Sequence, residues 1–399
     1  MATAHLPRRV VLILCCYCMS TGSILVVGPA TCLSAMAVDL GMVHEAQMGL
    51  FLGTPFWGLA AMTLFSGWLA ERLGYRLLLL ACAFLQAAGL LTISLAEGVA
   101  QAAAGSLLLG LGRGGVAAPL TALLCAIYPE DRTRVTNIFH AFFHIGMVAI
   151  ILFVLLLFHL DWDWRAIFQA FAALVLPIGI AALFVALPGG SRKEVEEGRM
   201  TLRSVSRQAG FGLLLMSMFF TGATELGPSS WLPYFIERAV GSSQVLGAVG
   251  LLLLSATMAA GRLAAPAIVR RMGVKFIFIA SSSVSAASIL LAALPVGTVF
   301  TVFWLTVLGV AISVNYPTLL AYAADRFPRA NASMFAILNG AAIGGCIAGP
   351  ASIGLAAEVF GLRPAMGLLA IAPIALLIGL WRLVQNTGAA AGQAVSYGS

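Results

Sequence analysis

The sequence predicts an all-α membrane protein with twelve transmembrane helices in two pseudo-symmetric six-helix halves. Of its 399 residues, 61% are hydrophobic and only 9% are charged, whereas soluble domains carry roughly 25% charged residues. The mean hydropathy is +1.01. A helix needs about 20 apolar residues to cross a bilayer, so this length has room for about twelve spans with short loops. We therefore expect lipid to cover most of the surface.

Twelve apolar segments can be placed along the chain. The predicted spans are 9–33, 47–70, 76–96, 100–127, 136–159, 164–187, 209–235, 243–268, 275–294, 298–323, 332–357 and 363–385. The longest polar stretch follows the sixth span. The predicted organisation is therefore an N-terminal six-helix half, a cytoplasmic linker, a C-terminal six-helix half and a disordered tail, at 1–188, 189–208, 209–385 and 386–399.

Charged residues alternate between the two sides of the predicted membrane. Arginines gather in the loops after spans 2, 4, 8 and 10 and in the linker, whereas the opposite loops are mostly acidic. Because loops rich in Lys and Arg stay in the cytoplasm, we expect both termini there, in a multi-pass protein of the cell inner (plasma) membrane. The net charge of +7 then reflects topology, and no nucleic-acid partner is expected.

The loop after span 2 carries a motif. It reads Gly67-Trp-Leu-Ala-Glu71-Arg72-Leu-Gly74-Tyr-Arg76, which resembles the signature loop of the major facilitator superfamily, G-x-x-x-[DE]-[RK]-x-G-[RK]-[RK], with Tyr departing at position 75. The loop after span 8 echoes it. The resemblance implies a monomeric secondary transporter of the major facilitator fold. Its predicted cytoplasmic latch, which would hold the outward-open state, consists of Gly67, Glu71, Arg72, Gly74, Arg76 and Arg262.

The physical basis of such a latch is that charged side chains can bridge helix ends. The alternative is that the loop charges only set the topology. Two further segments, 221–234 in span 7 and 137–146 in span 5, resemble the fucose-permease-like branch of sugar:proton symporters. That branch carries a membrane-embedded glutamate in span 4 where this chain has Gly115. The roles of that glutamate are therefore not carried over.

Two charged residues, Arg113 and Glu225, lie about mid-span and are too far from any predicted loop to belong to one. Charges inside a bilayer are costly and usually functional. Glu225 is the predicted proton-coupling group, because a buried carboxylate can bind a proton in one state and release it in another. The alternative is a permanent ion pair with Arg113. Arg113 could instead bind an anionic substrate, since a guanidinium pairs bidentately with carboxylate, sulfonate or phosphate.

Spans 1, 4, 7 and 10 each contain helix-breaking residues. These are Gly28-Pro29, Pro119, Gly227-Pro228 and Pro317, which can bend a helix beside a central cavity or simply kink the packing. Polar and aromatic residues near the breaks suit a polyhydroxylated solute, although Ser and Thr in membrane helices often bond to their own backbone. The predicted substrate-binding residues are Arg113, Tyr17, Thr21, His140, His144, Trp231, Tyr234, Asn315, Tyr316 and Asn339.

Together these patterns predict proton-coupled uptake of a small polar solute by alternating access, the solute being a sugar or sugar derivative, neutral or anionic. The alternative is an efflux antiporter for amphipathic drugs or organic anions. A membrane enzyme is not expected, because the chain has no Gly-x-Ser-x-Gly, Walker or His-rich metal pattern. No cofactor or metal is expected either. Cys15, Cys16 and Cys18 lack the spacing of a zinc site.

Overall fold

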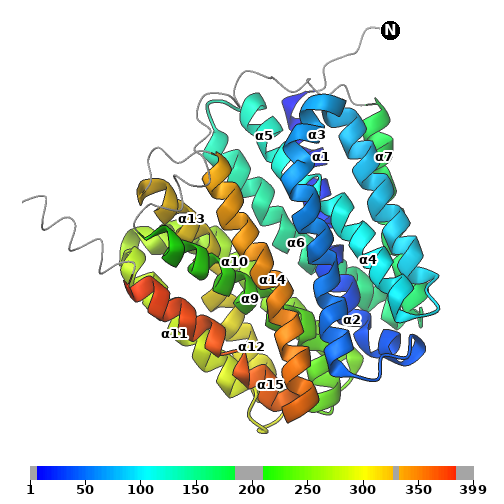
Figure 1. Cartoon of the computed structure of the whole chain (residues 1–399), viewed down its shortest axis with the longest axis vertical. Helices are drawn as coiled ribbons and strands as arrows, with labels where there is room; N and C mark the ends of the chain where they lie inside the picture. The colour runs from blue at the N-terminus through cyan, green and yellow to red at the C-terminus, as the bar shows by residue number, and fades with distance from the viewer. Residues whose placement is uncertain (1–6, 185–209, 327–331, 383–399) are drawn as a thin grey trace, which may run out of the picture. The chain divides into compact units, whose positions relative to one another are not determined.

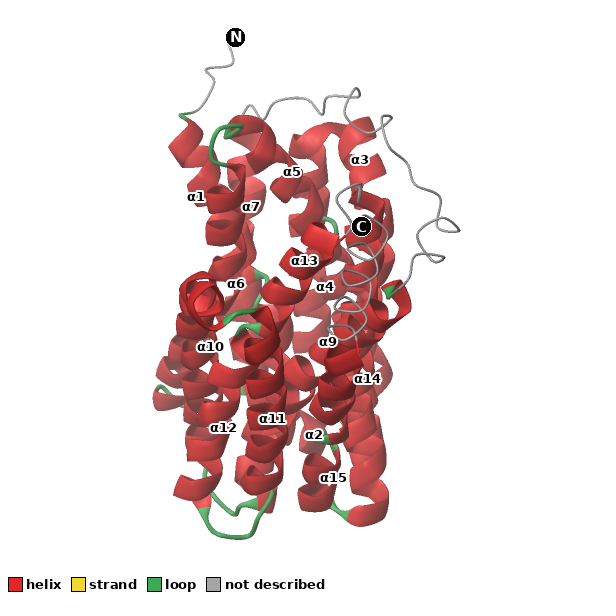
Figure 2. Ribbon diagram, turned by 90° about the vertical axis from the view of Figure 1, so that its left-hand side faces the viewer, coloured by secondary structure: helices red, strands yellow, loops and turns green. Residues whose placement is uncertain are grey.

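The computed structural model describes residues 7–184, 210–326 and 332–382, all of them in helices or short connections without strands (Figures 1 and 2). The predicted linker at 189–208 and tail at 386–399 lie outside these residues. The first helices are α1 Arg8–Thr21, α2 Ile24–Asp39, α3 Glu45–Ser94, α4 Val99–Gly114, α5 Ala117–Ile127, α6 Arg132–His159 and α7 Trp164–Phe184. The later ones are α9 Phe211–Tyr234, the π-helix η1 Phe235–Ala239, α10 Gln244–Met272, α11 Val274–Ala292, α12 Thr298–Ser313, α13 Asn315–Arg326, α14 Ala332–Phe360 and α15 Leu362–Leu368.

The number of spans agrees with the prediction. Ten stretches of the described residues are long and apolar enough to cross a membrane. One of them, α3, contains two spans, because its backbone leaves the helical conformation at Gly74. The helix α9, which is 24 residues long, adds another. The described chain therefore holds twelve spans.

Single glycines join consecutive helices at three places among the described residues, one of them Gly361 between α14 and α15. Gly74 divides α3 with φ 74° and ψ 158°, and Gly273 separates α10 from α11 with φ 79° and ψ 149°. Side chains rarely adopt this region, which is essentially open to glycine alone. Gly74 and Gly273, which occupy similar places in the loops after spans 2 and 8, thus each form the whole connection between two helices.

Spans 1, 4 and 10 are interrupted before their prolines and not at them. The helices stop at Gly22-Ser23, at Gly115-Val116 and at Val314. Pro119 and Pro317 each take the third position of the helix that follows. Proline is tolerated in a first helical turn because its missing N–H has no partner there. The breaks predicted at the prolines therefore lie a few residues earlier.

The two halves repeat one another at a constant spacing along the chain. The pairs Gly74 and Gly273, and Gly98 and Gly297, are separated by the same number of residues, and the glycines of the second pair both precede a helix. Close contacts repeat too: a Cβ added to Gly146 would overlap the Ser20 backbone, and one added to Gly345 would overlap the Phe219 backbone at that same spacing. We call this distance the repeat spacing.

The described residues form two compact units. The first unit comprises 7–184 with 229–256, and the second comprises 210–228 with 257–382. The segment 229–256 belongs to the predicted C-terminal half, but polar contacts connect it to α2. Ser34 Oγ donates to Glu237 Oε2 at 2.5 Å, and Gln244 Nε2 donates to the Thr31 carbonyl at 3.1 Å.

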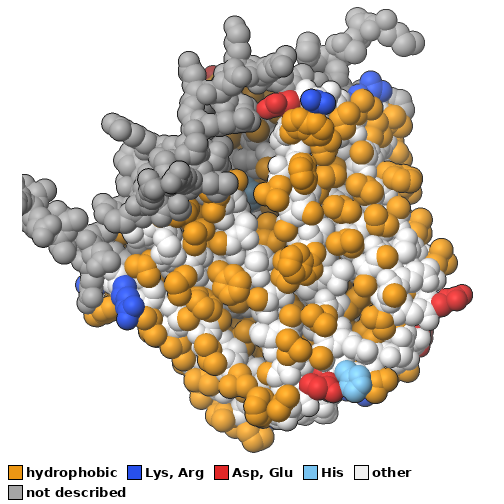
Figure 3. Space-filling model, viewed as in Figure 1, with side chains coloured by type: hydrophobic (Ala, Val, Ile, Leu, Met, Phe, Trp, Pro, Cys, Tyr) orange, Lys and Arg blue, Asp and Glu red, His pale blue; other side chains and the backbone are white. Residues whose placement is uncertain are grey.

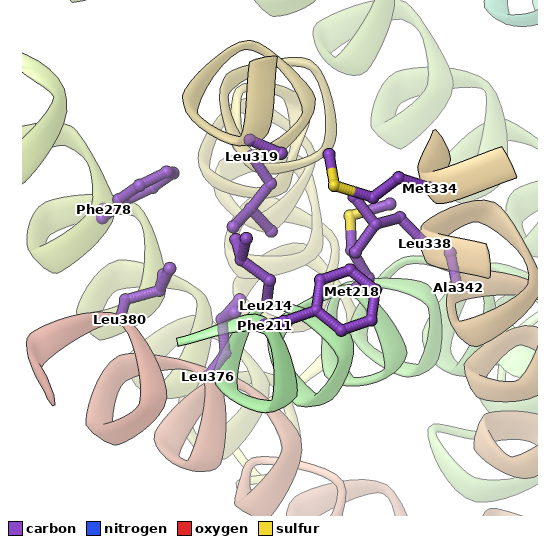
Figure 4. Close-up of a cluster of buried hydrophobic side chains, with 11 residues drawn as sticks. Phe211, Leu214, Met218, Phe278, Leu319, Met334, Leu338, Ala342, Leu376 and Leu380 are labelled. Atoms are coloured by element: carbon purple, nitrogen blue, oxygen red, sulfur yellow. The ribbon is translucent and has the colours of Figure 1, made fainter. Parts of the chain in front are cut away.

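Apolar side chains fill the second unit and also cover much of the molecular surface. A buried cluster joins α9, α11, α13 and α14 to the helical residues 371–382, with Met218 and Leu319 among its members (Figure 4). On the face drawn in Figure 3, hydrophobic side chains spread across the middle, and the visible charged side chains lie toward its margins. Such a surface is suited to contact with lipid.

Candidate functional site

An ion pair lies inside the membrane-spanning helices of the second unit. One nitrogen of Arg262, Nη2 on α10, donates to Glu225 Oε1 and Oε2 on α9, both at 2.7 Å. The side chains of Arg262 and Glu225 are 17% and 10% exposed. The latch role predicted for Arg262 stays a prediction. Its long side chain lets a residue near a helix end reach a carboxylate farther inside.

Polar residues from α13 and α14 surround this ion pair. The Arg262 guanidinium lies 5.8 Å from the ring of Tyr316, whose hydroxyl donates to Asn339 Oδ1. The Cys346 thiol is close enough to interact electrostatically with both Glu225 and Arg262. The structure therefore brings the predicted residues Tyr316 and Asn339 together with Glu225.

Asn315, the residue before Tyr316, is tied to another helix. Its Oδ1 accepts a hydrogen bond from Ser281 Oγ on α11 at 2.5 Å, and both side chains are buried. The amide that was predicted to bind substrate thus already has a protein partner at its oxygen.

Arg113 lies in the first unit, in the last turn of α4, with 4% of its surface exposed. Its Nη2 donates to the Met19 thioether at 2.7 Å, and its Cζ lies 6.0 Å from the Phe143 ring. In the part of the chain that the structure describes, Nη1 has no hydrogen-bond partner. The neighbours of the Arg113 guanidinium in the first unit are thus a thioether and an aromatic ring.

The interruption of span 1 gives Arg113 its room. A Cβ added to Gly22 would overlap Nε, Cζ and Cδ of Arg113. Gly22 follows the end of α1, and Arg113 is two residues before the interruption of span 4. Sequence reasoning did not identify Gly22 or Met19. A glycine in the middle of span 1 could have indicated the interruption, but the break was predicted at the later Gly28-Pro29.

The hydroxyl groups of span 1 bond to backbone carbonyls. Tyr17 donates to Leu174 O at 2.6 Å, and Thr21 is 3.2 Å from the carbonyls of Tyr17 and Cys18. Ser20 donates to Phe142 O at 3.1 Å. This arrangement agrees with the packing alternative for such residues.

The remaining predicted substrate residues all belong to the first unit. His144 is buried and meets the Phe143 ring edge-on, whereas His140 is exposed. Trp231 and Tyr234 are buried on α9, with ring centroids 5.7 Å apart in a T-shaped arrangement. Tyr17 and Thr21 come from α1, and the histidines come from α6.

The arginines of the predicted latch contact neighbours in the first unit. The Arg72 guanidinium lies 4.4 Å from the Trp68 ring centre, and Arg76 donates to the Leu183 carbonyl at 2.6 Å. Glu71 and Gly67 are exposed, and Gly74 forms the connection within α3. A latch role for these residues stays a prediction.

No group of three or more His, Cys, Asp or Glu residues is placed to hold a metal ion among the described residues.

The chain is similar to known transporters in sequence profile and in structure. The profile described as the Major Facilitator Superfamily matches residues 13–333. No curated protein matches the sequence significantly. Among solved structures, the nucleoside transporter NupG (D323A mutant) aligns with a TM-score of 0.74 at 16% identity, over 94% of this chain and 99% of that chain.

A second solved structure shows the same fold. It is a bacterial homologue of the human lysosomal transporter Spinster, in an inward-facing and unoccupied conformation, with a TM-score of 0.77 and 16% identity over 95% of this chain and 97% of that chain. The twelve spans, the repeated halves and the profile match lead to one conclusion. The chain is a multi-pass membrane transporter that belongs to the Major Facilitator Superfamily.

Proposed function

We propose that this transporter takes up a small polar solute together with protons, working as a monomer in the inner membrane with both termini in the cytoplasm. The observation that carries the proposal is the Glu225–Arg262 ion pair inside the spanning helices. The solute class that we propose is a sugar or sugar derivative. Alternating access would require the contacts of Ser34 with Glu237 and of Gln244 with Thr31 to break and re-form.

The ion pair supports proton coupling because its energy depends on the charge of Glu225. Removing one charge of a buried pair leaves the other without compensation, at a cost of about 3–5 kcal/mol. Protonation of Glu225 would do the same to Arg262, and would therefore favour a conformation in which Arg262 finds another partner. Arg262, Tyr316 and Cys346 are charged or titratable groups beside Glu225 in the described part of the second unit.

Glu225→Gln tests this role, since Gln keeps the shape and cannot exchange a proton. In vesicles given an inward proton gradient, the wild type should accumulate a labelled probe. The probes are L-fucose, D-glucuronate and uridine, the last because one structural neighbour is a nucleoside transporter. Glu225→Gln should abolish accumulation and retain exchange of the same probe between the two sides. A sodium gradient provides the control for the coupling ion.

The double variant Glu225→Gln, Arg262→Gln separates coupling from structure. It removes both charges, so a purely structural pair should be replaced with folding intact and gradient-driven accumulation restored. A proton carrier should instead fold and exchange the probe without accumulating it. Wild-type accumulation that ignores the proton gradient would contradict the proposal.

Export of amphipathic drugs or organic anions is the second candidate function, and the observation that favours it is the thioether-bound guanidinium of Arg113. A cation in the membrane interior is suited to an anionic cargo. The two directions are distinguished by reversing the gradient. Accumulation of D-glucuronate in vesicles with an outward, and not an inward, proton gradient would favour antiport.

A further inference from the structure

The charge of Arg113 is not neutralised by its neighbours. Its two terminal nitrogens have between them one thioether, a weak acceptor, on Nη2, and no partner on Nη1 in the described residues. Arg262, by contrast, has both oxygens of a carboxylate. Arg113 and Arg262 thus differ in whether a carboxylate of the protein already occupies the guanidinium, which decides whether each can bind an external anion.

Two features of the surroundings favour a cation without supplying a counter-ion. Arg113 lies in the last turn of α4, where the carbonyl end of the helix carries partial negative charge. The Phe143 ring lies 6.0 Å away, within reach of a cation–π contact. Both contributions are far weaker than an ion pair in the membrane interior. A ligand that brings a full negative charge to Arg113 would therefore gain binding energy that these neighbours do not provide.

Gly22 makes this arrangement possible. The three atoms nearest to a Cβ at position 22 all belong to the flexible side chain of Arg113, whereas those nearest to a Cβ at Gly146 belong to the backbone of Ser20. Adding a methyl group at Gly22 should therefore shift the guanidinium and leave the helix packing intact. Position 22 controls where the Arg113 charge lies.

We infer that Arg113 binds an oxyanion group of the transported solute, a carboxylate, sulfonate or phosphate, and that Gly22 is the positioning residue for its guanidinium. This inference rests on the proposed transport function and names its substrate class. One oxygen of the solute replaces the Met19 thioether as the acceptor for Nη2. The other accepts a hydrogen bond from Nη1, which has no acceptor among the described residues. A planar guanidinium binds two such oxygens at once, which an ammonium group cannot do.

The test uses four probes that share a glucose ring and differ at carbon 6: D-glucose, D-glucuronate, glucose 6-phosphate and 6-deoxy-6-sulfoglucose. Binding is measured on the full-length protein in an uncharged detergent by thermal shift and by titration calorimetry. At least one charged probe should bind about tenfold or more tightly than D-glucose. Arg113→Lys should lose about tenfold of that affinity and Arg113→Gln should lose the preference for charge.

Gly22→Ala should weaken the charged probe about tenfold and leave D-glucose unaffected. The matched control is Gly212→Ala, where nothing lies within 4 Å of the added Cβ; it should bind like the wild type. Arg113→Met tests whether Arg113 lacks a counter-ion in the protein. Without ligand, this variant should have a melting temperature no lower than that of the wild type, because no ion pair is broken. A marked fall in its melting temperature would show a structural role and overturn the inference.

Three further results would overturn the inference: D-glucose binding as tightly as every charged probe, no charged probe binding at all, or charge preference surviving in Arg113→Gln. A phospholipid headgroup offers the same phosphate chemistry. Stabilisation by phosphatidylglycerol that no soluble probe competes away would therefore also count against it. If a neutral probe is accumulated on a proton gradient while Arg113→Gln transports normally, the transport proposal stands and only this inference fails.

Discussion

At the residue scale, Arg113 and Arg262 both lie within spanning helices but have different partners. Arg262 is bonded to Glu225, whereas Arg113 contacts a thioether and an aromatic ring. The sequence placed Arg113 and Glu225 in the membrane interior, because no loop lies near them. It could not give their partners, since these depend on how each helix is rotated and on how far the Arg262 side chain extends.

Hydrogen bonds of buried hydroxyls also differ between neighbouring residues, and α11 provides a matched pair. Ser281→Ala should lower stability by about 1–3 kcal/mol, because it leaves the buried Oδ1 of Asn315 without its donor. Ser282→Ala should have little effect, since its hydroxyl is buried and has no partner among the described residues. Thermal unfolding in detergent compares the two. Equal melting temperatures for both variants would contradict the assigned bond.

At the element scale, the sequence predicted span boundaries well and interruptions poorly. Boundaries follow from long apolar runs ended by charges, so most predicted spans agree with the structure to within several residues. Interruptions depend on local backbone geometry. A proline restricts its own turn but allows the helix to begin up to a turn earlier, which is why the breaks near Pro119 and Pro317 lie at Gly115-Val116 and Val314. In span 1 the break at Gly22-Ser23 lies more than a turn before Pro29, which is inside α2.

The single-glycine connections at Gly74 and Gly273 should not tolerate a side chain. Gly74→Ala and Gly273→Ala should each cost about 1–3 kcal/mol, because alanine must adopt a positive φ with an extended ψ. Gly212→Ala is the control, since its Cβ meets nothing within 4 Å. Melting temperature and the yield of monodisperse protein are the measurements. Wild-type behaviour of both connection variants would show that these turns can relax.

At the scale of the whole molecule, the family match and the twelve spans establish the fold class, and topology follows from the distribution of charge. We predict cytoplasmic termini because the arginine-rich loops lie on the same side as both ends. Alkaline phosphatase fused after Pro295, in the connection between α11 and α12, should be active, and fused after Gly273 it should be inactive. Green fluorescent protein fused to Ser399 should fluoresce. The reverse pattern would invert the predicted orientation.

The repeat spacing has a consequence for how the two halves diverged. At that spacing Arg113 corresponds to Ile312, Glu225 to Val26 and Arg262 to Thr63, while His140 corresponds to Asn339. The scaffold was thus copied, but each charged group exists in one copy only. Two copies of the N-terminal half would carry Arg113 twice and no counterpart of Glu225, whereas two copies of the C-terminal half would carry the Glu225–Arg262 pair twice and no counterpart of Arg113. The three charged groups are therefore divided between the halves, and neither half carries all of them.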